Sequence, residues 1–128
     1  MRRFAVVATS AGAALAGLII FAQPVAAAYA ATKVTIAVKP TGGPQRSATL
    51  TCNPAGGTHK DAAAACAVLA AARGNPAAIT PADVMCTLEY APVQVTMVGR
   101  YNRKPVRFKR TYSNPCRLRA AAGPLFTV

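Results

Sequence analysis

The sequence predicts an α+β domain in which a helix covers one face of an antiparallel sheet. Short stretches of alternating apolar and polar residues recur along the chain, and they predict strands. One alanine-rich stretch between them favours a helix, and four cysteines can brace a small core. Short strands at hairpin spacing with one clear helix are typical of an antiparallel α+β domain.

The first residues have the pattern of an export signal. Arg2 and Arg3 precede an apolar stretch over residues 4–22, and small residues follow up to Ala30. A basic start, an apolar centre and a small-residue exit are what a secretory signal requires. A retained membrane helix is the alternative, but the stretch is near the lower length limit for spanning a bilayer.

We therefore expect residues 1–28 to be a signal peptide, with cleavage after Ala28 or Ala30. The mature chain of residues 29–128 is then secreted and has no stable membrane anchor. About a hundred residues are enough for one domain and too few for two.

Alternation predicts the strands. In residues 33–39, Val34, Ile36 and Val38 alternate with more polar residues, which is typical of a half-buried strand. Further strands are expected at residues 48–52, 93–98 and 106–112, with a turn at 99–103 between the last two and a fifth strand at 124–128.

The helix is expected over residues 62–73. Thr58 is predicted to be its N-cap, and Asp61 three residues later completes a capping box. Gly74-Asn75-Pro76 ends the helix. A second start signal at residues 80–83 predicts one more helical turn.

Four cysteines, an even number in an exported chain, predict disulfides. They are Cys52, Cys66, Cys86 and Cys116, and spacing alone leaves three pairings open. Zinc is the competing use of four cysteines. No two of them are separated by only two to four residues, so the usual zinc knuckle is absent and we expect no metal and no cofactor.

The chain is strongly basic. Its formal charge of +12 falls to +10 when Arg2 and Arg3 leave with the signal. The cations cluster late in the sequence, at Arg100, Arg103, Lys104, Arg107, Lys109, Arg110, Arg117 and Arg119. The alternative function is therefore a cationic secreted protein that binds surfaces or polyanions, or acts against microbes. No nucleic-acid partner is expected, because no base-stacking aromatic motif accompanies the cations.

An enzyme is not predicted. The single histidine, His59, lies at the expected helix start, where a structural role is more common. The three acids, Asp61, Asp83 and Glu89, show no pairing suited to acid–base catalysis, and no serine lies in a nucleophile elbow.

Residues 85–92 are the segment most suggestive of function. They expose Leu88 beside Glu89, with Cys86 fixing one end and Pro92 stiffening the other. A protease binds an extended peptide through its backbone and seats its side chains in pockets. A loop already held in the bound shape loses little entropy on binding, so it can inhibit rather than be consumed. Most disulfide-flanked loops are nevertheless only structural.

The wider pattern resembles the Streptomyces subtilisin inhibitor family of serine protease inhibitors, over about residues 33–128. The stretches that carry the resemblance are Leu50-Thr51-Cys52-Asn53-Pro54, Gly56-Gly57-Thr58-His59, Ala65-Cys66-Ala67, Val84-Met85-Cys86, Tyr90, Pro92-Val93, Ser113-Asn114, Cys116 and Phe126. Many separate motifs recur in order, so the resemblance is specific.

The resemblance implies a fold and an assembly. The fold would be a five-stranded antiparallel sheet with two helices on one side and two disulfides, Cys52–Cys66 and Cys86–Cys116. The assembly would be a homodimer joined through the sheet faces, and the partner would be a subtilisin-like serine protease.

The resemblance also implies a reactive bond between Leu88 and Glu89, two residues after the third cysteine. Leu88 would enter the main specificity pocket of the enzyme, which suits subtilisin-like and chymotrypsin-like proteases and disfavours trypsin. The other loop residues expected to contact the enzyme are Met85, Cys86, Thr87 and Tyr90. Asn114 would support the loop from behind; otherwise it is a turn residue before Pro115.

Some positions depart from the family pattern. Thr87 stands where proline is common, so the loop loses a lock on φ. Ala91 replaces a frequent aspartate, Lys60 a frequent proline and Tyr101 a frequent tryptophan. The positive charge is also high for the family.

Overall fold

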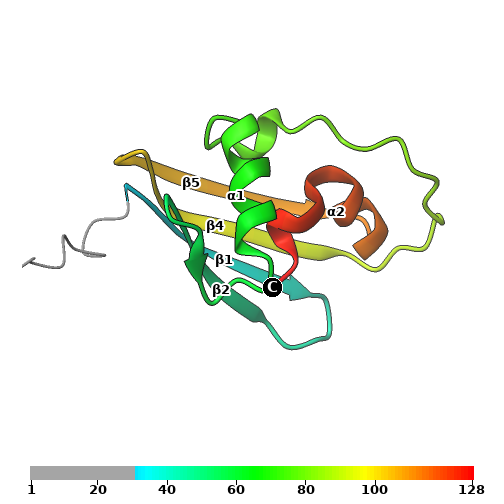
Figure 1. Cartoon of the computed structure of the whole chain (residues 1–128). Coiled ribbons are helices and arrows are strands. Elements are labelled where there is room, and N and C mark those ends of the chain that lie inside the picture. The colour runs from blue at the N-terminus through cyan, green and yellow to red at the C-terminus, as the bar shows by residue number, and fades with distance from the viewer. Residues whose placement is uncertain (1–30) are drawn as a thin grey trace, which may run out of the picture.

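The alternating stretches form the strands of one antiparallel sheet. The computed structural model describes residues 31–128, so the predicted export signal lies outside the described residues. The strands are β1 (Thr32–Pro40), β2 (Arg46–Cys52), β3 (Gly56–Gly57), β4 (Val93–Tyr101) and β5 (Lys104–Tyr112). Their order in the sheet is β3-β2-β1-β4-β5 (Figure 1).

One face of the sheet carries the core. In β1, Val34 and Ile36 are fully buried, whereas Lys33 and Thr35 are exposed. Directly paired residues share a face, so Leu50, Met97 and the other partners of the buried β1 residues join them. The opposite face, the open sheet face, is polar; it carries Lys33, Thr35, Ala37, Lys39, Gln94, Thr96, Val98, Arg100, Arg107 and Lys109.

The helices cover the apolar face. Figure 1 shows α1 (Ala62–Ala71) and α2 (Pro115–Ala122) on the same side of the sheet. Leu69 of α1 is fully buried and Leu118 of α2 is nearly so. The predicted α+β class, with five strands and two helices on one side, is confirmed. Within residues 31–128, no helix has the length and apolar character needed to cross a membrane.

The start of α1 differs from the prediction. Its N-cap is Asp61, whose carboxylate accepts from the Ala64 N–H at 3.4 Å. Thr58 instead pairs with Thr49 of β2: the Thr58 hydroxyl accepts from the Thr49 N–H at 2.9 Å, and the Thr58 N–H donates to the Thr49 carbonyl. The prediction of Thr58 as N-cap was wrong because the sheet edge takes up its hydrogen bonds.

The fifth strand is not at residues 124–128. Two residues, Gly56–Gly57, form it as β3, while the C-terminal segment folds into the 3₁₀ helix η3 (Gly123–Phe126). Neighbouring residues of a strand point to opposite faces. Leu125 and Phe126 are both buried, and Phe126 stacks on Phe108 with ring centroids 5.8 Å apart. A strand would expose one of these two side chains.

Residues 80–83 form no helical turn, contrary to the expectation. The Ala82 N–H donates to the Ala120 carbonyl of α2 at 2.7 Å, and this bond leads the chain away from a helical path. The 3₁₀ helix η2 (Pro76–Ala78) comes earlier and is capped by Asn75.

Two disulfides brace the domain. Cys52 at the end of β2 is joined to Cys66 of α1, and Cys86 is joined to Cys116 of α2, each with a Cα–Cα distance of 5.7 Å. These are the two pairings that the resemblance implies. The first bridge fixes α1 to the sheet, and the second fixes the segment before β4 to α2.

Candidate functional site

A long segment without regular structure, the exposed loop of residues 79–92, projects from one end of the molecule (Figure 1). Met85 and Leu88 are 101% and 94% exposed. Of the five large apolar residues that are exposed in residues 31–128, four lie in this loop: Val84, Met85, Leu88 and Tyr90. Clustered exposed apolar side chains mark interaction sites.

The loop is tethered at both ends. Upstream, the Ala82 N–H donates to the Ala120 carbonyl of α2 at 2.7 Å. Downstream, the Ala91 N–H donates to the Ser113 carbonyl at 2.9 Å, and the Pro92 carbonyl accepts from the Thr41 N–H at 2.9 Å. Both ends of the segment between these points are therefore fixed to the body of the domain.

The disulfide Cys86–Cys116 fixes the middle of the loop. Cys86 is half-buried, whereas Met85 and Thr87 on either side of it are exposed. The cross-link therefore draws one residue of the loop inward onto α2. It leaves the next residues standing out from the surface.

Asn114 supports the loop from below. Its Nδ2 donates to the Thr87 carbonyl at 3.1 Å and to the Glu89 carbonyl at 2.9 Å. Its Oδ1 accepts from the Arg117 N–H at 2.9 Å and so caps α2. The side chain is only 4% exposed. One buried amide thus holds the carbonyls on both sides of the Leu88–Glu89 peptide bond and ties them to a helix start.

This arrangement can present the Leu88–Glu89 peptide bond to a peptide-binding cleft while both sides of the bond stay attached to the domain. The Leu88 side chain points to solvent, and its backbone is held before and after the bond by Asn114 and by the disulfide. Such a segment offers an extended backbone and side chains to a cleft that binds peptides. Little conformational entropy remains to be lost on binding.

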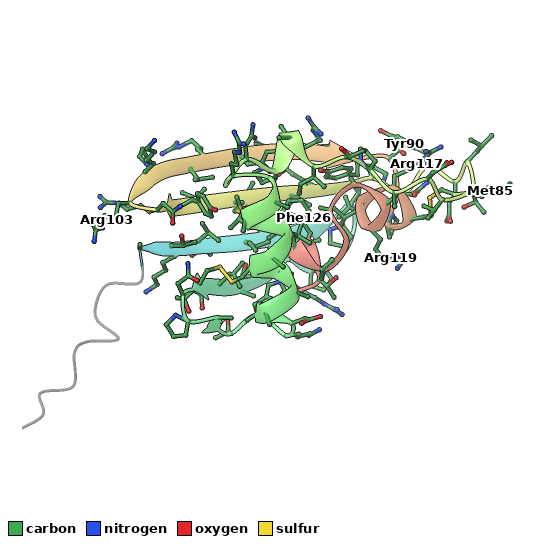
Figure 2. The ribbon with its side chains drawn as sticks, turned by 45° about the horizontal axis from the view of Figure 1, so that its top comes forward. Met85, Tyr90, Arg103, Arg117, Arg119 and Phe126 are labelled. Atoms are coloured by element: carbon green, nitrogen blue, oxygen red, sulfur yellow. A yellow bond between two sulfur atoms is a disulfide. The ribbon has the colours of Figure 1, made fainter. Side chains whose placement is uncertain are left out.

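Charges are segregated around the loop. Asp83 and Glu89 are two of the three acids of the chain, and both lie in it. Arg117 and Arg119 lie on α2, at the same end of the molecule as the loop (Figure 2), and Arg119 lines a hollow with Pro44 and Arg46. The loop therefore carries two of the three acids of a strongly basic chain.

The predicted site residues come together. Met85, Cys86, Thr87, Leu88, Glu89 and Tyr90 follow one another on the loop, and Asn114 reaches them from a point 25 and 27 residues away in sequence. The sequence analysis missed the tethers at Ala82, Ala91 and Thr41. It also left α2 unplaced, although Asn114 followed by Pro115 is a helix start signal.

His59 has a structural environment. The Asp61 N–H donates to its Nδ1 at 3.1 Å, so Nε2 carries the proton and donates to the Leu125 carbonyl at 3.1 Å. The ring is 6% exposed and joins the start of α1 to η3. The expectation of a structural histidine agrees with these contacts.

The cations predicted as one cluster divide into separate groups. Arg117 and Arg119 lie on α2, at the same end of the molecule as the exposed loop, and Arg103 lies at the opposite end (Figure 2). Arg110 covers the Phe108 ring at 5.6 Å. Lys109 and Arg107 lie on the open sheet face.

Comparison with known proteins gives a consistent result. A family profile described as subtilisin inhibitor-like matches residues 25–114, more than half of the chain. Subtilisin inhibitor-like protein 3 of Streptomyces coelicolor is 48% identical over 89 residues, which are 68% of this chain and 83% of that protein. The subtilase-type protease inhibitor of Streptomyces coelicolor is 43% identical over 89 residues, and here the chain spans 62% of the length of the relative.

A solved structure is also similar. It is the crystal structure of Streptomyces caespitosus sermetstatin in complex with Bacillus licheniformis subtilisin. The similarity has a TM-score of 0.60 and 30% sequence identity, and it covers 75% of this chain and 97% of that one.

Proposed function

This chain belongs to the subtilisin inhibitor-like family, and we propose that it is a secreted, substrate-like inhibitor of subtilisin-like serine proteases. The observation that carries the proposal is the pair of hydrogen bonds from Asn114 to the carbonyls of Thr87 and Glu89. The similar sermetstatin was solved in complex with a subtilisin, which supports the choice of enzyme class. Membership of an inhibitor family agrees with the prediction that the chain is not an enzyme.

Binding would place the exposed loop in the substrate cleft. The fully exposed Leu88 would enter the main specificity pocket, and Met85 would fill the apolar pocket three residues upstream. Cys86, Thr87 and Tyr90 would contact the walls of the cleft. Because Leu88 is apolar, enzymes with large apolar pockets are favoured, and trypsin-like enzymes would leave a buried acid without a partner.

Cleavage would be reversible. The serine oxygen of the enzyme attacks the Leu88 carbonyl carbon, and the bond to the Glu89 nitrogen breaks. The released amine stays nearby because the Glu89 carbonyl remains bonded to Asn114 and Ala91 remains bonded to Ser113. Attack of this amine on the acyl-enzyme re-forms the peptide and frees the serine. The high effective concentration of a tethered amine favours this return over hydrolysis.

We also propose a homodimer that forms through the open sheet face, as the resemblance implies. The middle of this face carries Thr35 and Thr96 with Val98, which is 47% exposed. Cations lie around them, which makes the assembly sensitive to salt.

The alternative function, a cationic surface-binding or antimicrobial protein, has no support from the comparisons. The cations form no single patch that would replace the loop as the main site.

The decisive experiment is to incubate the mature protein with subtilisin and to map any slow cut by mass spectrometry. We expect tight inhibition and a single slow cleavage between Leu88 and Glu89, with the cut form still inhibitory. Rapid digestion without inhibition would overturn the proposal.

A specificity exchange tests the position of the bond. Leu88→Lys should raise the affinity for trypsin at least about a hundredfold and weaken subtilisin inhibition, because the lysine pairs with the acid of the trypsin pocket. Ala67→Lys, on the exposed surface of α1, is the matched control and should change neither. A gain of trypsin inhibition in the control, or none in Leu88→Lys, would contradict the assignment.

A further inference from the structure

A compact group of cations lies at the end of the molecule opposite the exposed loop. Its members are Arg73, just after α1, and Arg103 and Lys104, at the β4–β5 turn; we call this group the basic pole. All three side chains are exposed. Figure 2 shows Arg103 at one end of the molecule and Met85 at the other.

The structure brings these residues together although they are distant in sequence. Arg73 and Lys104 line a shallow hollow of about 310 Å³ together with Arg107, Tyr101 and Asn75. They also line a neighbouring hollow of about 310 Å³ with Tyr101 and Asn102. Gly74 packs so closely on Tyr101 that a Cβ atom at this position would overlap the Tyr101 ring. This packing fixes the end of α1 against the hairpin, so the spacing of the cations is set by the fold.

No acid neutralises the basic pole. The chain has only three acids. Asp61 caps the far end of α1 from Arg73, and Asp83 and Glu89 belong to the exposed loop at the other end of the molecule. The positive potential of the pole is therefore not offset by a neighbouring carboxylate.

Two of the three cations stand where glycine is sterically favoured. Arg73 has φ +52° directly after the C-cap of α1; its N–H donates to the Ala70 carbonyl, and the Gly74 N–H donates to the Leu69 carbonyl. These two bonds define a Schellman motif, in which the residue at the position of Arg73 is usually glycine.

The hairpin turn also has an arginine at a position where glycine is favoured. Asn102 and Arg103 form the two-residue turn between β4 and β5, with φ +48° and +69°. Asn-Gly is the preferred pair in such a turn, because a side chain is disfavoured at positive φ. An arginine kept at a strained backbone position motivates the hypothesis that its side chain has a function.

We propose that the basic pole binds the phosphate groups of a linear anionic polymer while the exposed loop remains free to engage a protease. The planar guanidinium fork of arginine matches the oxygen geometry of phosphate. The hollows are shallow and lined by Arg73 and Lys104, and Arg103 lies beside Lys104 on the exposed hairpin turn. Several phosphates spaced along a flexible chain therefore fit better than one enclosed anion. Such binding would retain the inhibitor on a phosphate-rich matrix with its loop directed outward.

The test uses long-chain inorganic polyphosphate as the probe, immobilised for interferometry. The wild-type protein should bind, and Arg73→Gln/Arg103→Gln/Lys104→Gln should bind at least tenfold more weakly, with a reduced dependence on salt. Lys39→Gln/Arg46→Gln/Lys60→Gln removes the same charge far from the pole and should lose less than threefold. Equal losses in the two triple variants would mean attraction by net charge alone and would overturn the site.

Two further measurements test the choice of ligand and the separation of the basic pole from the exposed loop. The choice of ligand would be overturned if orthophosphate displaced the protein at the same phosphate concentration as the polymer. It would also be overturned if the protein bound duplex DNA more tightly than polyphosphate. A preformed complex with subtilisin should still bind polyphosphate; mutual exclusion would overturn the separation of the two ends.

The strained arginine gives an independent readout. Arg103→Gly should raise or preserve the melting temperature, because glycine suits the turn, while it weakens polyphosphate binding several-fold. Unchanged binding in Arg103→Gly would contradict a role for this side chain. Subtilisin inhibition should be unchanged in both pole variants, so failure of this proposal is distinguishable from failure of the inhibitor function.

Discussion

The side-chain nitrogen of Asn114 lies 2.9 Å from the carbonyl oxygen of Glu89, on the leaving side of the proposed reactive bond. The same nitrogen reaches the Thr87 carbonyl on the other side, and the oxygen of the amide caps α2. Each polar atom of this buried side chain therefore has a partner. The loop and the helix that carries Cys116 are consequently aligned by one residue.

Asn114→Asp separates the two tasks of this side chain. Aspartate is as good an N-cap as asparagine, so α2 should keep its cap. Its carboxylate has no hydrogen to donate to the loop carbonyls. Two lost hydrogen bonds of about 1 kcal/mol each predict cleavage by subtilisin about thirtyfold faster. The measurement is the rate at which inhibition decays, with the melting temperature recorded beside it.

Asn114→Ala is the companion variant and loses the cap as well. It should show the same fast cleavage and an additional loss of stability of about 1 kcal/mol. An Asn114→Asp protein that inhibits for as long as the wild type would show that the loop does not need this support.

The two disulfides should differ in what their removal changes. Replacement of Cys86 and Cys116 by alanine frees the middle of the loop, so the protein should become a substrate that is cut quickly. Replacement of Cys52 and Cys66 should leave the loop intact. In the chain-entropy account the bridges contribute about 3.5 and about 3 kcal/mol to the free energy of unfolding, so both variants should melt at lower temperature.

The comparison is made at a temperature where both variants are folded, as judged by circular dichroism. Inhibition of subtilisin per folded molecule should fall only in the Cys86/Cys116 variant. An equal fall in both variants would mean that global stability, and not bracing of the loop, determines inhibition.

Strands were predictable where apolar and polar residues alternate because only one face of the sheet is buried, as at Val34 and Ile36 of β1. The two-residue strand Gly56–Gly57 carries no such pattern, because its pairing depends on the backbone of Leu50 and Thr51. The cap at Thr58 was wrong for a related reason: Thr49, which takes up its hydrogen bonds, is nine residues away. Local signals do not report bonds of this kind.

The sequence predicts which stretch forms the site, but not the hydrogen bonds that fix this stretch to the rest of the domain. Leu88 and its neighbours are contiguous, so a motif could identify them. The tethers join residues far apart in sequence, such as Thr41 with Pro92. Only the folded chain brings their backbones together. The sequence of the C-terminal segment likewise predicts a strand. In the fold Phe126 stacks on Phe108, and its neighbour Leu125 is buried as well.

Thr87→Pro should slow cleavage. The Thr87 N–H has no hydrogen-bond acceptor among the residues that the structure describes, so proline removes no bond there. It restricts φ and thereby reduces the freedom of the unbound loop. A gain of about 0.4–1 kcal/mol corresponds to about two- to fivefold tighter inhibition. Weaker inhibition by Thr87→Pro, in a protein that melts like the wild type, would show that the extended loop cannot accommodate proline.

His59→Phe should destabilise the domain without touching the loop. The Asp61 N–H and the buried Leu125 carbonyl would each lose a partner, and the carbonyl alone accounts for about 1–3 kcal/mol. Chemical denaturation should show a lower midpoint, whereas inhibition per folded molecule should be unchanged. A variant as stable as the wild type would contradict the structural role of the two ring nitrogens.

The proposed dimer should strengthen as salt is added. Lys33 and Arg100 are directly paired on the open sheet face, and Arg107 and Lys109 follow on β5, so two copies stacked through this face would bring like charges together. The screening length falls from about 30 Å at 0.01 M salt to about 3 Å at 1 M. Apolar contact at Val98 is insensitive to this screening, so the repulsion alone should diminish. Sedimentation velocity should therefore show a smaller dissociation constant at the higher salt. Val98→Arg should raise the dissociation constant at every salt concentration. Dimers that dissociate as salt is added would instead indicate an interface held by opposite charges elsewhere on the surface.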